Sequence, residues 1–368
     1  MAARENNVPQ KGIKRTLQLR EIAPSDLEEV ARFISRVSGS ASPLPRAVDR
    51  LSWILLENPA RGPGDPLGWF LRAPSGEVVG CMCCAPQKFC FGRTTLTLLM
   101  ANSFYVDDQY RGGGTSVLLR YLQLGRRYPL FVSSANATVA EMWRKLGGYP
   151  LGNSDGEVLG VLRWQPLLAE SVYRKTASDR MARFTAALAS PWLRVRRRLL
   201  PSEAEGELVP LGSPEEAARL CAEHRSDKIT SCRDAPFLKW RYFSRLGPTT
   251  RMFAFRPCDG KKKQFMVGVH LQNRGYKQQI RALHVLDIWG EADPKTYLAI
   301  ADCLIREYRD QIDMLVFRCL NPAQQQALTA NGFKVRPFAA PIAWCIDKHG
   351  LLPSKTWYFV PADGDMFL

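Results

Sequence analysis

The stretch from Phe104 to Leu119, Phe-Tyr-Val-Asp-Asp-Gln-Tyr-Arg-Gly-Gly-Gly-Thr-Ser-Val-Leu-Leu, constrains the fold more than any other part of the chain. Its first residues are typical of the end of a strand, Arg111 to Gly114 is a glycine-rich turn, and apolar residues recur at helical spacing from Thr115. Glycines let a backbone approach a ligand, and the first amides of a helix point at negative oxygens. The stretch therefore predicts an anion site, and a pyrophosphate is the ligand that fits it.

Length and charge narrow the possible classes of protein. A chain of 368 residues predicts two domains, and a net charge of +16 favours acidic partners such as nucleic acid, a membrane surface or a phosphorylated ligand. No run of about 18 uninterrupted apolar residues indicates a membrane span. Residues 1–15 are polar, lack the apolar core of a secretory signal and are predicted to be a disordered tail.

The ten cysteines are scattered along the sequence, and the first histidine is His224. A zinc site with cysteine and histidine spacing is therefore not expected, and no metal is predicted. We expect the cysteines to be buried and reduced, as in a cytoplasmic protein.

The order of predicted elements suggests a duplication. The first half predicts strands and helices in the order strand 16–22, helix 25–37, helix 43–56, strands 68–72, 77–85 and 89–100, the opening stretch with its helix, strand 130–134, helix 138–146 and strand 157–164. Asn136 lies eleven residues before Gly147, and Asn321 lies eleven residues before Gly332. The second half has a similar order, so we predict two tandem α/β units, each a mixed, largely antiparallel sheet flanked by helices.

Gln109-Tyr110-Arg111-Gly112-Gly113-Gly114 fits the acyl-CoA pyrophosphate signature of the GNAT acyltransferase superfamily, Q/R-x-x-G-x-G/A. Asn136, Trp143 and Lys145-Leu146-Gly147 are similar to a second segment of that family. The order of elements extends the resemblance to this superfamily over 16–165. We therefore expect an N-terminal GNAT domain at 16–168, a basic helical linker at 169–206 and a degenerate GNAT-like domain at 207–368. Segments 235–242 and 357–365 resemble tandem GNAT-like proteins encoded with bacterial exopolysaccharide genes.

The resemblance implies how a cofactor would bind. In the family, a strand splays from its neighbour, and pantetheine binds to the backbone at positions matching Phe104 and Val106. The amides from Arg111 to Ser116 would hold the pyrophosphate of acetyl-CoA or another acyl-CoA. The cofactor-binding residues implied in this way are Phe104, Val106, Gln109, Arg111, Gly112, Gly113, Gly114, Thr115, Ser116, Asn136 and Trp143.

Candidate catalytic residues are less well defined. Trp143 stands where the family often has a tyrosine general acid, and an indole N–H is not an acid at neutral pH. Tyr149 lies just beyond it and is a candidate. Asp107 or Asp108 is a candidate base, although either can also be a solvated turn carboxylate, and Asn102 is a candidate to orient an amine.

The second half lacks the glycine loop. Gly290-Glu291-Ala292-Asp293-Pro294 has two acids, which would repel a pyrophosphate, so this half is interpreted as having lost cofactor binding. Asp363 and Asp365, near the chain end, either fold back toward a substrate or form a solvated tail. Trp240, Tyr242 and His284 are expected in the core.

The segment 170–206 alternates arginines with apolar residues. It is either a helix packed between two domains or, over 173–200, a contact for an anionic membrane surface.

Three functions remain open. The first is an acyl-CoA-dependent N-acyltransferase, most simply an acetyltransferase, acting on a small-molecule amine. The second uses acyl carrier protein or aminoacyl-tRNA as donor, although the intact loop argues against nucleic acid. The third is a non-catalytic acyl-CoA-binding module. A homodimer is compatible with each.

Overall fold

The computed structural model describes residues 17–39, 43–195, 206–224, 226–244, 250–258, 263–290, 292–352 and 357–364. The tail predicted at 1–15 and Asp365 lie outside these ranges. Contacts divide the chain into two compact units. The first contains residues up to 56, 63–85 and 101–124, and the second contains 57–62, 86–100 and the chain from 125 onward.

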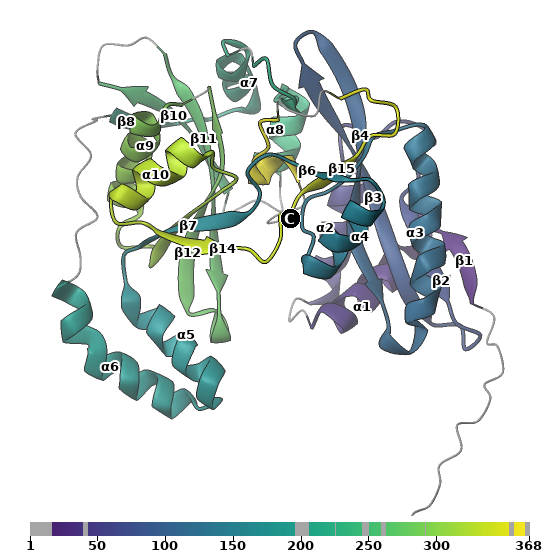
Figure 1. Cartoon of the computed structure of the whole chain (residues 1–368), viewed down its shortest axis with the longest axis horizontal. Helices are drawn as coiled ribbons and strands as arrows, with labels where there is room; N and C mark the ends of the chain where they lie inside the picture. Colours follow the sequence, from purple (N-terminus) through teal and green to yellow (C-terminus); the bar gives the residue numbers. More distant parts are fainter. Residues whose placement is uncertain are drawn as a thin grey trace, which may run out of the picture. The chain divides into compact units, whose positions relative to one another are not determined.

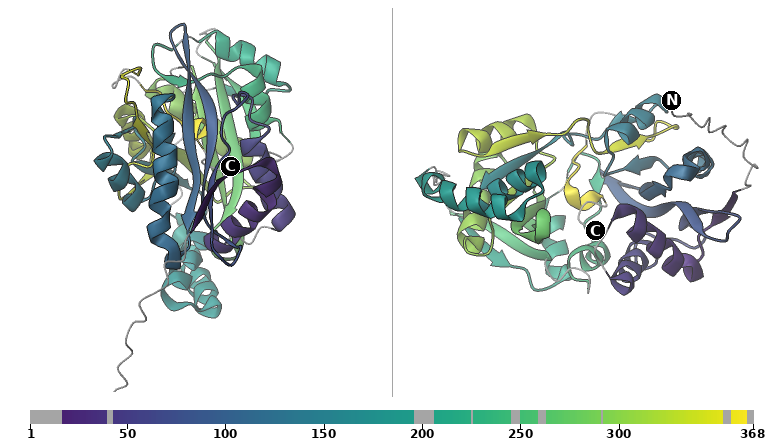
Figure 2. Two further views of the ribbon diagram at one scale, coloured as in Figure 1. Left: turned by 90° about the vertical axis from the view of Figure 1, so that its right-hand side faces the viewer. Right: turned by 90° about the horizontal axis from the view of Figure 1, so that it is seen from below.

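The first unit is a sheet covered by helices on both faces. Its elements are β1 (Gln18–Glu21), α1 (Leu27–Ser38), α2 (Leu44–Leu55), β2 (Gly68–Arg72), the beginning of β3 (Val78–Phe91), the end of β4 (Thr94–Val106) and α3 (Gly114–Gln123). The strand order β1-β2-β3-β4 follows the sequence, with β1 antiparallel to β2 and β2 antiparallel to β3. Helices α1 and α2 cover one face of these strands, and α3 covers the other (Figure 2).

Strands β3 and β4 run on into the second unit, where the order continues β4-β5-β15-β6. The new elements are β5 (Leu130–Val132), α4 (Ala137–Lys145), β6 (Tyr149–Pro150), β9 (Thr230–Ser231) and β15 (Trp344–Ile346). The Leu99 amide donates to the Pro129 carbonyl at 2.9 Å, and β9 pairs with the far end of β3. Both β5 and β6 are antiparallel to β15.

The second unit also contains a separate seven-stranded sheet (Figure 1). Its order is β14 (Lys334–Pro337), β7 (Gly156–Val161), β13 (Met314–Arg318), β12 (Ile280–Trp289), β11 (Phe265–Arg274), β10 (Thr250–Pro257) and β8 (Gly206–Pro210). Strands β12 and β13 are parallel, and the other neighbours are antiparallel. The predicted mixed α/β architecture, two mixed sheets flanked by helices, is confirmed.

The two sheets exchange strands between the halves of the sequence. Strand β7, assigned to the unit 16–168, pairs with β13 and β14 of the seven-stranded sheet. Strand β15, assigned to the unit 207–368, pairs with β5 and β6. The sequence did not predict this exchange, because backbone hydrogen bonds that select a neighbouring strand leave no mark in side-chain composition.

The seven-stranded sheet is covered on both faces. On one face, α9 (Pro294–Tyr308) and α10 (Pro322–Ala330) contribute to a core with Val267, Leu283 and Phe317 of the strands. On the other face, Leu167 of α5 (Trp164–Thr176) packs against a smaller cluster around Ile280. The remaining helices of this unit are α6 (Asp179–Val195), α7 (Pro214–Ala222) and α8 (Ala235–Tyr242).

The repeated asparagine-to-glycine spacing has a local cause. The Asn136 side chain caps α4 by accepting from the Val139 amide at 2.9 Å, and Gly147 ends the helix at a φ of 81°. The Asn321 side chain caps α10 by accepting from the Gln324 amide at 2.9 Å, and Gly332 has a φ of 90°. The shared spacing is thus an N-cap and a left-handed C-terminal glycine around two helices of nine residues each.

The expectation that all cysteines are reduced is wrong for one pair. Cys90 at the end of β3 and Cys232 after β9 form a disulfide that closes a separation of 142 residues. The other eight cysteines are free thiols, and most of them are buried. The pair forms because β9 is antiparallel to the end of β3, which brings together two cysteines that the sequence keeps far apart.

Candidate functional site

The glycine stretch lies at the end of β4, where the strand is irregular. Ser103 has a φ of 53°, a left-handed conformation that is uncommon for a residue with a side chain. Its carbonyl accepts from the Cys81 thiol at 3.4 Å, and its hydroxyl donates to the side-chain oxygen of Asn102. Asn102 is only 5% exposed. This irregularity lies within β4, directly before Phe104 and Val106, where the resemblance places pantetheine.

The turn itself is a short helix that leads directly into α3. A 3-10 helix, η2 (Asp108–Gly113), is followed without a break by α3, which begins at Gly114. The Tyr110 amide donates to the Asp107 carbonyl at 2.8 Å, and the Gly114 amide donates to the Arg111 carbonyl. Part of the predicted row of amide donors from Arg111 to Ser116 is therefore used inside the turn in this conformation.

The three glycines have different surroundings. A side chain at Gly112 would meet nothing within 4 Å. At Gly113 a Cβ atom would lie 2.5 Å from Leu17 Cδ1, and at Gly114 it would lie 3.0 Å from Val106 Cγ2. Gly113 and Gly114 therefore let the turn pack against the strands, and Gly112 is the glycine that faces open space.

The other polar residues of this stretch are exposed or locally paired. Gln109 and Thr115 are exposed, and the Ser116 hydroxyl donates to the Gly113 carbonyl at 2.7 Å. Arg111 is 76% exposed and pairs with Asp108 at 2.8 Å. Arg111 can therefore swing toward a phosphate, because an exposed pair of this kind is weakly held.

Asp107 is held by a cation. Its carboxylate lies 2.9 Å from the Arg36 guanidinium of α1, and its amide donates to the Val79 carbonyl at 2.9 Å. Both contacts fix the start of the turn against its neighbouring elements. These contacts give Asp107 a structural role and make it a weaker candidate for the catalytic base.

Three of the predicted residues belong to the second unit. Asn136 caps α4, Trp143 is 1% exposed within the core, and Tyr149 lies on β6. Burial raises the pKa of Tyr149 above its ordinary value, with Cys345 adding to the effect. Tyr149 is therefore protonated at neutral pH and is a weak acid. Leu328, at the position equivalent to Trp143, is also fully buried.

In the second half, the loop that corresponds to the glycine turn ends in a carboxylate that caps the following helix. The Asp293 side chain accepts from the Thr296 amide at 2.8 Å and caps α9. Gly290 has a φ of 125°, and a Cβ atom there would lie 2.8 Å from Phe265. An acid thus occupies the helix start of this half, at the place where an anionic ligand would otherwise meet free amides.

Sequence reasoning missed a buried ion-pair network in the second unit. Arg233 donates to Asp287 at 2.7 Å and to Asp363 at 3.0 Å, and its guanidinium lies 4.3 Å from the centre of the Trp289 ring. All three charged side chains are at most 1% exposed. Of the two alternatives for Asp363, the solvated tail is excluded, because this carboxylate folds back, is buried and pairs with Arg233. No motif identified Arg233, because its partners are distant in sequence.

The expected core residues are confirmed. Trp240, Tyr242 and His284 are 8%, 3% and 1% exposed. Burial, together with Arg318 and Arg274, lowers the pKa of His284 well below its ordinary value, so the ring is neutral.

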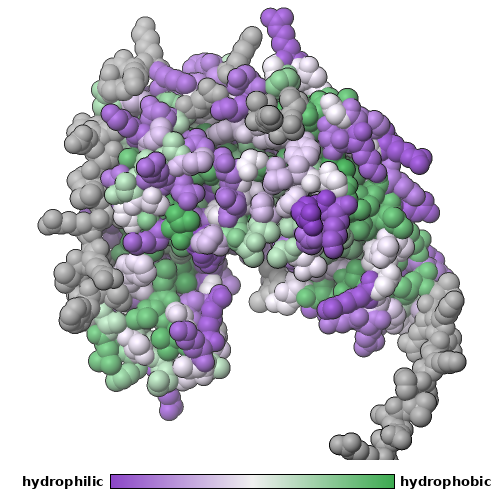
Figure 3. Space-filling model, viewed as in Figure 1, coloured by the Kyte–Doolittle hydropathy of each residue, from purple (hydrophilic) through white to green (hydrophobic). Residues whose placement is uncertain are grey.

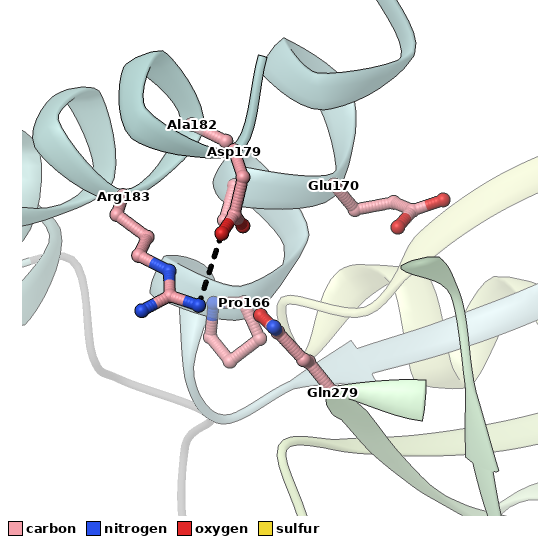
Figure 4. A pocket seen from close by; sticks show the side chains of 7 residues that line it. Pro166, Glu170, Asp179, Ala182, Arg183 and Gln279 are labelled. Carbon is pink, nitrogen blue, oxygen red and sulfur yellow. Dashed lines mark ion pairs between the residues drawn. The ribbon is translucent and has the colours of Figure 1, made fainter. Parts of the chain in front are cut away.

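The described parts of the chain contain no cluster of side chains suited to a metal ion. No group of three or more histidine, cysteine, aspartate or glutamate side chains there could hold a metal ion. A small pocket between α5 and α6, drawn in Figure 4, has a volume of about 10 Å³, which is room for one water molecule. This pocket is too small for a cofactor.

No protein-family model matches the chain, and no curated protein matches its sequence. Solved structures do match. A GCN5-related N-acetyltransferase from Anabaena variabilis superposes with a TM-score of 0.51 at 12% identity, over 90% of this chain and 72% of that one. A putative acetyltransferase from Pyrococcus horikoshii gives 0.52 at 10% identity, over 98% and 100%. Saccharomyces cerevisiae N-myristoyltransferase with bound myristoyl-CoA gives 0.55 at 11% identity, over 93% and 85%.

These matches extend over both halves of the chain and share its mixed sheets and flanking helices. Because the identities are low, the likeness concerns the fold. The chain has the fold of the GCN5-related N-acetyltransferases.

Proposed function

We propose that this protein is an acyl-CoA-dependent N-acyltransferase with one cofactor site, at the end of β4, η2 and the start of α3. The observation that carries the proposal is the combination of an irregular strand end at Ser103 with a turn whose Gly112 faces open space. Two structural neighbours support it by name, an N-acetyltransferase and an N-myristoyltransferase with bound myristoyl-CoA. Acetyl-CoA is the simplest donor.

The reaction requires little from the protein beyond positioning. The amine nitrogen attacks the thioester carbonyl carbon, a C–N bond forms, and the C–S bond breaks to release the CoA thiolate. One proton leaves the amine for a base or water, and the thiolate takes a proton from an acid or water. Holding the two reactants in line supplies much of the rate enhancement.

The first unit offers one residue for these steps. Asn102 is buried at the irregular part of β4 and is proposed to orient the amine or the thioester carbonyl. Tyr149, the other candidate, belongs to the second unit, and its raised pKa makes it a weaker acid than an ordinary tyrosine, so water is proposed as the proton donor to the thiolate. Asp107 is not retained as the base, because Arg36 holds its carboxylate.

The proposal is tested by thiol release. Wild-type protein is mixed with acetyl-CoA and a panel of amines, and free CoA is followed with a thiol reagent. Gly112→Glu places a carboxylate in the open space of the turn without a steric conflict, so the fold is preserved. Repulsion of the pyrophosphate should lower kcat/KM at least about tenfold, the effect of about 1.4 kcal/mol.

Thr94→Glu is the matched control, because Thr94 is exposed at the other end of β4. It adds the same charge and should leave kcat/KM unchanged. Equal rates for Gly112→Glu and wild type would place the cofactor elsewhere. Binding of acetyl-CoA with no thiol release for any amine would favour the non-catalytic acyl-CoA-binding module.

A further inference from the structure

One face of helix α6 is buried and consists of small residues. Ala182 is 3% exposed and Ala186 is 8% exposed, and they lie one turn apart. Figure 4 shows Ala182 and Asp179 of α6 beside the pocket that Pro166 of α5 also lines. The Asp179 carboxylate accepts from Lys277 at 3.1 Å. Helix α6 therefore packs against α5 through its alanine face. This packing determines which residues of α6 are left on its exposed side.

The outer face of α6 is apolar and exposed. Met181 is 51% exposed, and Phe184 and Leu188 are each 64% exposed. Their spacing of three and four residues places them on one side of the helix. No other helix in the described ranges exposes more than one large apolar residue. Figure 3 shows the apolar atoms gathered at the lower left, where α5 and α6 lie in Figure 1.

Cations border this apolar face. Arg180 is exposed and lies one turn before Phe184, and Arg183 is 66% exposed. The end of α5 adds Arg174, which is 74% exposed, and Lys175. Between 171 and 195 the sequence has five basic residues and one acidic residue, Asp179. Asp179 is itself paired with Arg183 at 3.0 Å.

We propose that α6 is an interfacial helix that binds the surface of an anionic lipid bilayer. Met181, Phe184 and Leu188 enter the boundary between headgroups and acyl chains, and the neighbouring arginines contact lipid phosphates. An apolar face beside a cationic face, on a helix that lies flat, is the arrangement such binding needs. Among the residues described, no helix is long and apolar enough to cross a bilayer.

Charge favours lipid over a second copy of the chain. In a two-fold dimer through this face, the arginines of one copy would meet those of the other, and like charges at an interface repel. Charge also separates lipid from nucleic acid. A polyanion bound through phosphates alone would leave Phe184 and Leu188 exposed and would not depend on them.

The test is sedimentation of the full-length protein with vesicles. Vesicles of phosphatidylglycerol mixed with phosphatidylcholine should carry the protein down, and vesicles of phosphatidylcholine alone should not. Phe184→Glu combined with Leu188→Glu should weaken the partition coefficient at least tenfold. Arg180→Glu should weaken it several-fold, and added salt should reproduce part of that loss.

Leu351→Glu is the matched control, because Leu351 is 50% exposed and lies far from α6 in the sequence. It should leave vesicle binding unchanged. The thermal unfolding temperature of each variant should match that of wild type. A second double variant, Phe184→Ser with Leu188→Ser, removes the same apolar side chains without adding charge and should also weaken vesicle binding. These measurements require no enzyme activity, so failure of the proposed function would not affect them.

Three outcomes would overturn the proposal. The first is equal binding of wild type and the α6 variants to anionic vesicles. The second is a concentration-dependent dimer in solution that the Phe184 and Leu188 substitutions abolish, which would make the occupant a second copy. The third is binding to vesicles that depends on Arg180 but not on Phe184 and Leu188, which would indicate a purely electrostatic contact.

Discussion

Arg233 shows how a single residue can connect distant parts of this chain. Its guanidinium joins Asp287 of β12 to Asp363 near the chain end, and it also donates to the Ser231 carbonyl at 2.7 Å. Burial raises the pKa of Asp287 to about 6 and raises that of Asp363. Arg233 is the cation with which both carboxylates form ion pairs, so its loss would leave two buried charges without this ion-pair partner.

Removing that cation should therefore be costly. We predict that Arg233→Met destabilises the protein by about 3–5 kcal/mol, because it leaves two buried carboxylates unpaired. The measurement is urea denaturation followed by tryptophan fluorescence. The control, Arg32→Met, removes an exposed pair with Glu28 whose side chains are 61% and 64% exposed, and should cost less than about 1 kcal/mol. Equal effects of the two variants would contradict this account of the network.

The glycines of the turn differ from one another in their neighbours. The sequence predicted the turn and the helix after it, since glycines and helical spacing are local signals. It did not distinguish Gly112 from Gly113, because the neighbours that crowd Gly113 are Leu17 and Leu71, which are remote in sequence. The position of a candidate site in the chain can therefore be predicted from the local sequence pattern. The side chains that surround each residue of the site cannot, because they come from distant parts of the sequence.

At the scale of elements, strand β9 is attached to β3 by a covalent bond as well as by backbone pairing. The disulfide between Cys90 and Cys232 closes a loop spanning 142 residues, and the Cys232 amide donates to the Lys88 carbonyl at 2.9 Å. Loop-closure entropy gives such a cross-link about 5 kcal/mol of stabilisation. The residues that it holds in place include Ser231 and Arg233 of the ion-pair network.

The disulfide gives a prediction at this scale. In denaturant without reductant, a thiol reagent should count eight thiols, and after reduction it should count ten. Reduction or a Cys90→Ser and Cys232→Ser double variant should lower the free energy of unfolding by several kcal/mol. Ten reactive thiols before reduction would show that the two cysteines are not joined in solution.

Helices were more predictable than sheets. The N-caps of α4, α10 and α9 are asparagine or aspartate that accept from backbone amides within three residues, so each helix start carries a local sequence signal. The strand predicted at 157–164 corresponds to β7, but its pairing with β13 was not predicted, nor was the pairing of β15 with β5. A strand chooses its neighbour through backbone groups that every residue has, and the choice is made only when the chain folds.

At the scale of the whole molecule, the two halves of the chain differ at corresponding helix starts. The first half has Gly112 facing open space, and the second half has Asp293 capping the equivalent helix. The proposed function therefore predicts one cofactor per chain, because the Asp293 carboxylate would repel a second pyrophosphate.

The most direct test is a calorimetric titration of the full-length protein with acetyl-CoA. The account predicts a stoichiometry of one per chain for wild type, and loss of binding for Gly112→Glu while Thr94→Glu binds as wild type does. Two sites per chain, or no binding of acetyl-CoA or of longer acyl-CoA thioesters, would contradict it.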